Sequence, residues 1–137
     1  MTIAEKETDI INEFAIFEDW MEKYEYIIDL GKDLPIIKEQ LKTEDKIIKG
    51  CQSQVWVNSE LEGGKMRFTA DSDAIITKGI IALLIRVLDN ETPTDVAKAE
   101  LNFIKAIGLQ EHLSPTRANG LVSMVKKMKM DALKLVN

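Results

Sequence analysis

The residue best suited to chemistry in this sequence is Cys51, the only cysteine among 137 residues. It follows Gly50, precedes the polar residues Gln52, Ser53 and Gln54, and leads into a strand-like stretch. A buried structural cysteine usually has apolar neighbours, so these flanks favour a thiol on the tip of a loop. A thiolate attacks sulfur, carbon or a metal, and its reactivity depends on its pKa and its accessibility. The sequence therefore predicts a nucleophilic thiol at this position.

The rest of the sequence restricts the reactions open to this thiol. His112 is the only histidine, and nothing around it in the sequence brings it to Cys51 as a catalytic base, so we interpret it as a loop or cap residue. The sequence has no second cysteine that could resolve a mixed disulfide within the chain. One cysteine and one histidine also cannot supply the three or four ligands of a zinc or iron–sulfur site. We therefore expect Cys51 to complete its cycle with another molecule and the chain to bind no metal.

Three charged residues are weaker candidates. Asp71 and Asp73 could hold a cation, although strand alternation and helix capping explain both more simply. Arg117, in the first turn of a predicted helix, could pair with a carboxylate or stabilise a thiolate. An ordinary surface salt bridge is an equally good interpretation of Arg117 on spacing alone.

Composition limits the class of protein and its partners. The sequence has 18 Lys and Arg against 23 Asp and Glu, a net charge of −5 that opposes the phosphate neutralisation on which nucleic-acid binding relies. Its 45% of hydrophobic residues is enough for the core of one domain over residues 1–137. The first residues lack the features of a signal or transit peptide, and no apolar run approaches the ~20 residues of a membrane-spanning helix. We therefore expect a cytoplasmic domain that binds neither nucleic acid nor a membrane.

The apolar pattern predicts an α+β fold, with a small curved antiparallel sheet of about three strands packed against several helices. Apolar residues at three- and four-residue spacing predict two helices before Gly31. Strands are expected at residues 47–48, 54–61 and 66–71, with Gly63 and Gly64 forming a two-residue turn between the last two. Further helices are predicted at the following positions: residues 74–88, 93–98 and 101–107, and from Pro115 towards the C-terminus.

For two of these elements the sequence also predicts which side chains face the core and which residues cap the helix. Alternation places Val55, Val57 and Leu61 on the same side of a half-buried strand. The helix over residues 74–88 is apolar nearly all the way round, so it belongs at the centre of the core, and Ser72 or Asp73 can cap it.

Four motifs occur in a fixed order along the chain. They are Trp20-x-x-x-Tyr24-x-Tyr26-Ile27-Ile28-x-Leu30-Gly31, Ile48-x-Gly50-Cys51-Gln52-Ser53-Gln54-Val55-Trp56, Asp71-Ser72-Asp73-Ala74 followed by Lys78-Gly79, and Leu113-Ser114-Pro115-x-Arg117-x-x-Gly120-Leu121. Together they resemble the SufE/CsdE family of sulfur acceptors, which work with cysteine desulfurases in iron–sulfur cluster assembly.

The resemblance implies a SufE-like fold and a specific reaction. In that reaction Cys51 accepts persulfide sulfur from a SufS-like or CsdA-like cysteine desulfurase, stimulates that enzyme and passes the sulfur to an iron–sulfur scaffold protein. The chain would thus be an accessory sulfur-transfer protein rather than a free-standing enzyme. Thiolate attack on a sulfur–sulfur bond needs one nucleophilic cysteine in each partner, so no bound cofactor is expected beyond a transient persulfide. Pyridoxal phosphate would belong to the desulfurase.

The resemblance also implies which residues surround the acceptor. The cysteine loop can be shielded in an apolar recess and move out when the desulfurase docks, which would protect a persulfide from reductants and oxidants. The residues implied in loop support and docking are Gly50, Gln52, Ser53, Gln54, Asp73 and Arg117.

Two other functions remain open on the residues alone. One is a small thiol-dependent redox enzyme that reduces a peroxide through a sulfenic acid on Cys51. The other is a non-catalytic iron–sulfur scaffold or binding module, against which the missing cysteines count heavily.

Overall fold

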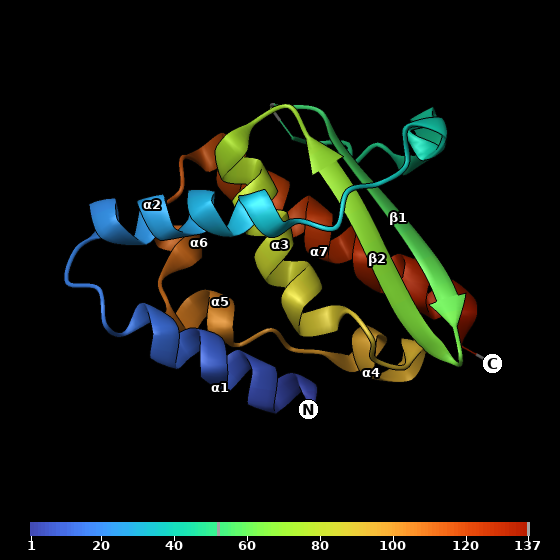
Figure 1. Ribbon diagram of the computed structural model, residues 1–137, viewed down its shortest axis with the longest axis horizontal. Helices are drawn as coiled ribbons and strands as arrows, with labels where there is room; N and C mark the ends of the chain where they lie inside the picture. The colour runs from blue at the N-terminus through green and yellow to red at the C-terminus, as the bar shows by residue number, and fades with distance from the viewer. Residues whose placement is uncertain (52, 137) are drawn as a thin grey trace.

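The fold places one β-hairpin beside a central helix, with further helices around both (Figure 1). It is known from a computed structural model that describes residues 1–51 and 53–136. The principal elements are α1 (Ile3–Phe14), α2 (Trp20–Leu30), β1 (Val55–Glu62), β2 (Lys65–Ser72), α3 (Ile75–Leu88) and α7 (Pro115–Leu135). Shorter elements are α4 (Pro93–Lys98), α5 (Phe103–Ala106), α6 (Leu109–His112) and three 3₁₀ turns at Gly31–Asp33, Glu39–Leu41 and Glu44–Lys46. This mixture of helices and an antiparallel sheet confirms the α+β class.

The hairpin has the two-residue turn that the sequence predicts. β1 and β2 pair from Val55 opposite Ser72 to Glu62 opposite Lys65. Gly63 and Gly64 have φ values of 60° and 80°, the left-handed conformations that a two-residue hairpin turn requires. Leu61 lies on the core side by register but next to the turn, where the core ends, and 51% of it is exposed.

The sheet has fewer strands than the sequence suggests. Among the described residues it has two strands, and the expected strand at residues 47–48 is reduced to a bridge between Ile47 and Trp56. The 3₁₀ turn Glu44–Lys46 lies directly before this bridge, and Gly50, with a φ of 91°, follows closely. The chain between these two bends is too short to pair over more than one residue.

Helix α3 occupies the centre of the core, as predicted, except at its first turn. Ile75 is 65% exposed there, so the helix is not buried on all sides although the exposed residue is apolar. Its N-cap is Ala74, which has no side-chain cap bond, while the Ser72 hydroxyl accepts from the Ala74 N–H. The predicted Asp73 cap is wrong because that carboxylate accepts instead from the backbone N–H of Gln54. Asp73 therefore joins the start of α3 to the cysteine loop.

Helices α2 and α3 touch backbone to backbone. A Cβ atom added to Gly79 would lie 2.0 Å from the Ile27 carbonyl oxygen, and one added to Gly31 would lie 2.8 Å from the Gly79 nitrogen. Only glycine permits this approach. The contact fixes α2 against the central helix and thereby places Tyr24, which lies one turn before Ile27.

Two helix starts predicted for the last part of the chain are confirmed. Thr92 caps α4, and Ser114 caps α7 by accepting from the Arg117 N–H. The predicted helix over residues 101–107 is shorter because Leu101 has a φ of 55°, outside the helical range, and α5 begins only at Phe103. No helix within residues 1–51 and 53–136 is long and apolar enough to cross a membrane.

Candidate functional site

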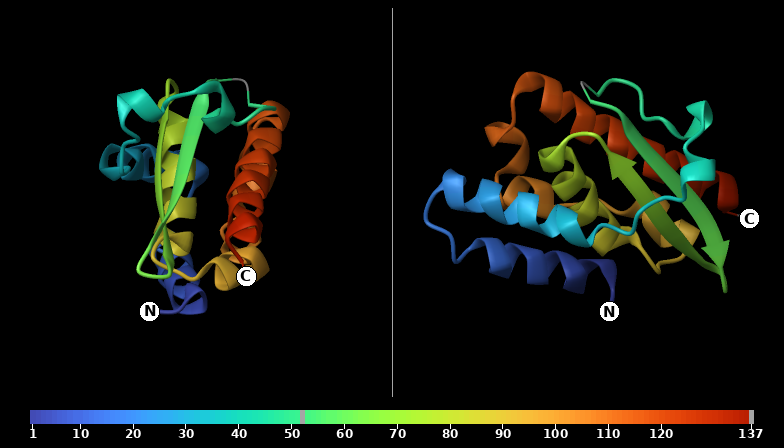
Figure 2. Two further views of the ribbon diagram at one scale, coloured as in Figure 1. Left: turned by 90° about the vertical axis from the view of Figure 1, so that its right-hand side faces the viewer. Right: turned by 45° about the horizontal axis from the view of Figure 1, so that its top comes forward.

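The cysteine loop connects the 3₁₀ turns to β1 and lies near the start of α7 (Figure 2). The Gln54 N–H donates to Asp73 Oδ1 over 3.0 Å, and the Gln54 carbonyl oxygen accepts from the Ser72 hydroxyl over 2.8 Å. Ahead of the cysteine, the Ile48 N–H donates to the Val55 carbonyl oxygen over 2.8 Å. These bonds hold both ends of the loop against the hairpin, so that its tip is positioned by β1 and the start of α3.

Gly50 allows the loop to lie close to α7. Its φ of 91° is in the left-handed region that favours glycine. A Cβ atom at this position would also lie 2.9 Å from Ser123 Oγ on α7. Both constraints apply to the residue directly before Cys51, so a side chain here would disturb the position of the thiol.

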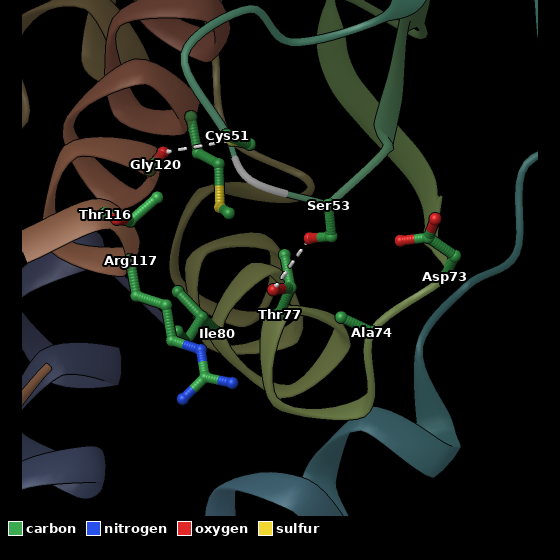
Figure 3. A pocket seen from close by; sticks show the side chains of 10 residues that line it. Cys51, Ser53, Asp73, Ala74, Thr77, Ile80, Thr116, Arg117 and Gly120 are labelled. Carbon is green, nitrogen blue, oxygen red and sulfur yellow. Dashed lines mark hydrogen bonds between the residues drawn. The ribbon is translucent and has the colours of Figure 1, made fainter. Parts of the chain in front are cut away.

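Cys51 is half-buried over a recess between the loop, α3 and α7. The recess has a volume of about 360 Å³ and is lined by Cys51, Ser53, Asp73, Ala74, Thr77, Ile80, Thr116, Arg117, Gly120 and Met124 (Figure 3). Its inner wall consists of the buried residues Thr77, Ile80, Gly120 and Met124, whereas its outer edge carries exposed and charged side chains. The thiol thus has free volume beside it and partial shelter from solvent.

The thiol rests against the backbone of α7. Cys51 Sγ lies 3.8 Å from the Gly120 carbonyl oxygen, to which the thiol can donate. A Cβ atom at Gly120 would lie 3.1 Å from Cys51 Sγ, closer than van der Waals contact. Burial raises the pKa of the Cys51 thiol above its ordinary value, because the thiolate loses hydration in this position. The resting protein therefore holds Cys51 mainly as the protonated thiol at neutral pH.

This raised pKa predicts a particular pH profile for alkylation of Cys51. Because only the thiolate reacts, the rate of alkylation by iodoacetamide should rise with pH to a midpoint above about 8.5, the usual value for a cysteine. The same chain unfolded in denaturant provides the control and should show the ordinary midpoint. A folded-state midpoint at or below the unfolded one would contradict the shielding of Cys51.

Arg117 reaches the edge of the recess from the first turn of α7. Its Nη1 donates a hydrogen bond to the hydroxyl of Tyr24, which belongs to α2. Within the described part of the chain, no carboxylate lies within 4.0 Å of its guanidinium, so it forms no salt bridge there. The guanidinium thus keeps its positive charge uncompensated beside the recess.

The structure brings together most of the residues singled out by sequence. Cys51, Ser53, Asp73 and Arg117 all line the recess. Gly50 and Gln54 flank it and shape the loop through their backbones. Gln52 lies outside the described residues.

Two other sequence candidates lie in different surroundings. Asp71 is paired with Lys42 at 2.7 Å and with Lys78 at 3.4 Å, which leaves it engaged with cations of the chain itself. His112 stacks on Trp20, with ring centroids 4.2 Å apart, and its Nδ1 lies 2.9 Å from the Gly108 carbonyl oxygen. Neither residue lines the recess.

Sequence reasoning gave no role to several recess residues. Thr77 projects from α3 with its Oγ1 3.3 Å from Ser53 Oγ, and it is one of few buried polar residues. The sequence feature that could have identified Thr77 is a polar residue inside an otherwise apolar helical stretch. Gly120 carried a second signal, since a glycine inside a helix costs about 1 kcal/mol relative to alanine and often marks a close contact. Met124 gave no signal because it fits the apolar face of α7.

Comparison with known proteins finds related sequences and a similar fold. A family model described as "SufE: Fe-S metabolism associated domain" matches residues 8–132. An uncharacterized SufE-like protein of Rhizobium meliloti is 36% identical over 128 residues, which are 90% of this chain and 91% of the relative. Another, of Synechocystis sp., is 39% identical over 124 residues, which are 90% and 78% of the two chains. The solution structure of a hypothetical protein from Thermus thermophilus has the same fold, with a TM-score of 0.78 over 94% of each chain at 22% identity.

Proposed function

The chain belongs to the SufE family, and on this premise we propose that it is a sulfur acceptor for a cysteine desulfurase, with Cys51 as the acceptor. The family assignment gives a sulfur-transfer role in Fe–S metabolism. The observation that carries the finer proposal is the position of the thiol, half-buried against Gly120 beside a recess of about 360 Å³. This volume offers space for an additional sulfur atom beside Cys51 Sγ.

The proposed reaction needs two displacements at sulfur. The Cys51 thiolate attacks the terminal sulfur of the desulfurase persulfide, the sulfur–sulfur bond breaks, and its electron pair remains on the desulfurase cysteine as a thiolate. Cys51 then carries the persulfide, and a thiolate of the scaffold protein removes the terminal sulfur in the same way. Both steps proceed without a net oxidant or reductant. Docking must expose Cys51, because its sulfur rests against α7 and its loop is anchored at both ends.

The raised pKa of Cys51 supports sulfur transfer over the peroxide-reducing alternative. A peroxidatic cysteine must be a thiolate in the free protein, because its small substrate cannot change the surroundings of the thiol. A desulfurase that docks on the loop can change the surroundings of the thiol, either by exposing it or by placing a positive group beside it. Burial that raises the thiol pKa therefore suits a cysteine that reacts only within a complex.

The proposal is tested by the turnover of a cysteine desulfurase with and without the chain. With a thiol reductant present to remove the sulfur from Cys51 after each transfer, we expect the rate of alanine release from cysteine to rise with added chain until the desulfurase is saturated. Peroxide consumption with an external thiol should stay near the background rate. An unchanged alanine release together with rapid peroxide consumption would replace sulfur transfer by the redox function.

Arg117→Ala should weaken this stimulation while the fold survives. Arg117 is exposed and forms no salt bridge among the described residues, so it is available to a partner, and its removal should lower the stimulation about fivefold, equivalent to ~1 kcal/mol. Lys134→Ala is the matched control, because it removes an exposed positive charge from the same helix far from the recess. Full stimulation by Arg117→Ala, or equal loss in both variants, would remove Arg117 from the docking surface.

A further inference from the structure

We infer that Thr77 is a positioning residue for Cys51: through its hydrogen bond to Ser53, it holds the cysteine loop closed over the recess. In the closed position, which the structure shows, Cys51 and Ser53 lie against α7 and α3; in an open position both would move away from these helices. Closure is a property of the free chain, and only its consequence for docking rests on the proposed function.

The Thr77 hydroxyl lies on the buried side of the central helix. Within α3, all of whose residues are described, Thr77 alone is both polar and buried, with 5% of it exposed. A threonine inside a helix commonly bonds the carbonyl oxygen of its own preceding turn. The described partner of Thr77 lies instead on the cysteine loop, since its Oγ1 is 3.3 Å from Ser53 Oγ. Because a buried hydroxyl without a partner is costly, Thr77 favours the loop position that supplies Ser53.

The Ser53 bond joins α3 to the part of the loop that carries the thiol. Ser53 follows Cys51 by two residues and lines the same recess, and Figure 3 marks its bond to Thr77. The bonds of Gln54 lie farther along, where the loop enters β1. Nearer the thiol, the other described polar contact is the 3.8 Å approach of Cys51 Sγ to the Gly120 carbonyl oxygen. A thiol is a weak donor, so the Ser53 bond is the stronger of these two contacts.

Opening of the loop separates the two hydroxyl groups. Each then exchanges its partner for water, so the bond favours the closed position only by the modest net energy of one hydrogen bond. This is enough to keep most molecules closed and to limit the access of reductants and oxidants to Cys51. It is also small compared with the contacts that a docked protein makes, so a desulfurase can open the loop.

The rate of Cys51 alkylation by iodoacetamide measures closure without a desulfurase. Only the accessible thiolate reacts readily, so the rate rises with the fraction of molecules whose loop is open. The proteins compared are wild type, Thr77→Val, Ser53→Ala, the double variant and Thr69→Val. The last is the control, because it makes the same exchange at a half-buried threonine of β2 that does not line the recess. Denaturant unfolding of the five proteins separates loop opening from a loss of global stability.

We expect Thr77→Val and Ser53→Ala each to be alkylated about fivefold faster than wild type, because each leaves one hydroxyl without its partner in the closed loop. The double variant should react more slowly than either single variant, since two apolar side chains leave no hydroxyl unpaired. The pH midpoint of alkylation should fall in the single variants, because an open loop hydrates the Cys51 thiolate, and return towards wild type in the double variant. Thr69→Val should match wild type.

Thr77→Val also separates loop opening from direct contact with a partner. Thr77 is buried, so its side chain is not part of the surface that a desulfurase meets. A loop that is open more often should lower the concentration of chain that half-saturates desulfurase stimulation by up to about fivefold, with the maximal stimulation unchanged. An unchanged half-saturating concentration would overturn the consequence for docking. A desulfurase that does not respond to wild type would reject the proposed function and leave the alkylation result valid.

Three results of the alkylation experiment would overturn the role of Thr77. One is a wild-type rate in either single variant. Another is a double variant that reacts as fast as the faster single variant or faster, which would show that the two side chains act independently of their bond. The third is an equal acceleration in Thr69→Val.

Discussion

Gly79→Ala is expected to lower the free energy of unfolding by about 3 kcal/mol or more. The added methyl group would lie 2.0 Å from the Ile27 carbonyl oxygen and 2.6 Å from the Ile27 carbonyl carbon. These are backbone atoms of α2, so no side-chain rotation can relieve the clash. Helices α2 and α3 must separate, at the expense of the core packing around Ile27 and Ile80.

Denaturant unfolding measures this effect, and Gly120→Ala provides a matched control. Gly120 also lies inside a helix, but an added Cβ there meets mainly the Cys51 side chain, at 3.1 Å. Because the loop can yield, we expect the fold of Gly120→Ala to be retained, with a gain of up to about 1 kcal/mol from helix propensity. Its Cys51 should be alkylated faster than in wild type, since the thiol loses its resting place. Equal unfolding midpoints for Gly79→Ala and wild type would contradict the close contact of α2 and α3.

Cys51→Ser is expected to abolish sulfur acceptance entirely, reducing desulfurase stimulation to background. Serine is close to cysteine in size, but its hydroxyl is not ionised at neutral pH and cannot carry a sulfane sulfur as a persulfide does. Burial and loop contacts should change little, so thermal unfolding should be nearly unaffected. Thr8→Ala serves as the control, because it removes an exposed hydroxyl on α1 that does not line the recess and whose described bond is to the Ala4 carbonyl oxygen of its own helix. Sulfur acceptance that survives in Cys51→Ser would move the reaction away from this residue.

The sequence predicts well those features that depend on residues close together in the chain. The turn at Gly63 and Gly64 follows from the φ values that only glycine adopts easily. The start of α7 follows from Ser114 and Pro115, which favour the cap and the first helical turn. The counts of one cysteine and one histidine limit the chemistry open to Cys51 within the chain, and that chemistry stays a prediction.

Features that depend on distant segments were harder to predict. The carboxylate of Asp73 bonds to the cysteine loop because β2 delivers it beside Gln54, which sequence spacing does not reveal. The bond between Tyr24 and Arg117 joins residues 93 positions apart, and it forms because Gly79 lets α2 lie directly on α3. Shape complementarity between helices thus determines the charged edge of the recess, and local propensity carries no information about it.

The intact mass of the chain after incubation with a cysteine desulfurase and free cysteine tests the central claim most directly. We predict that the wild-type chain gains the mass of one sulfur atom, that a thiol reductant removes this gain, and that Cys51→Ser shows no gain. Omission of the desulfurase should leave the wild-type mass unchanged. A wild-type chain that remains at its original mass beside an active desulfurase, or a Cys51→Ser chain that still gains sulfur, would contradict the assignment of Cys51 as the sulfur carrier.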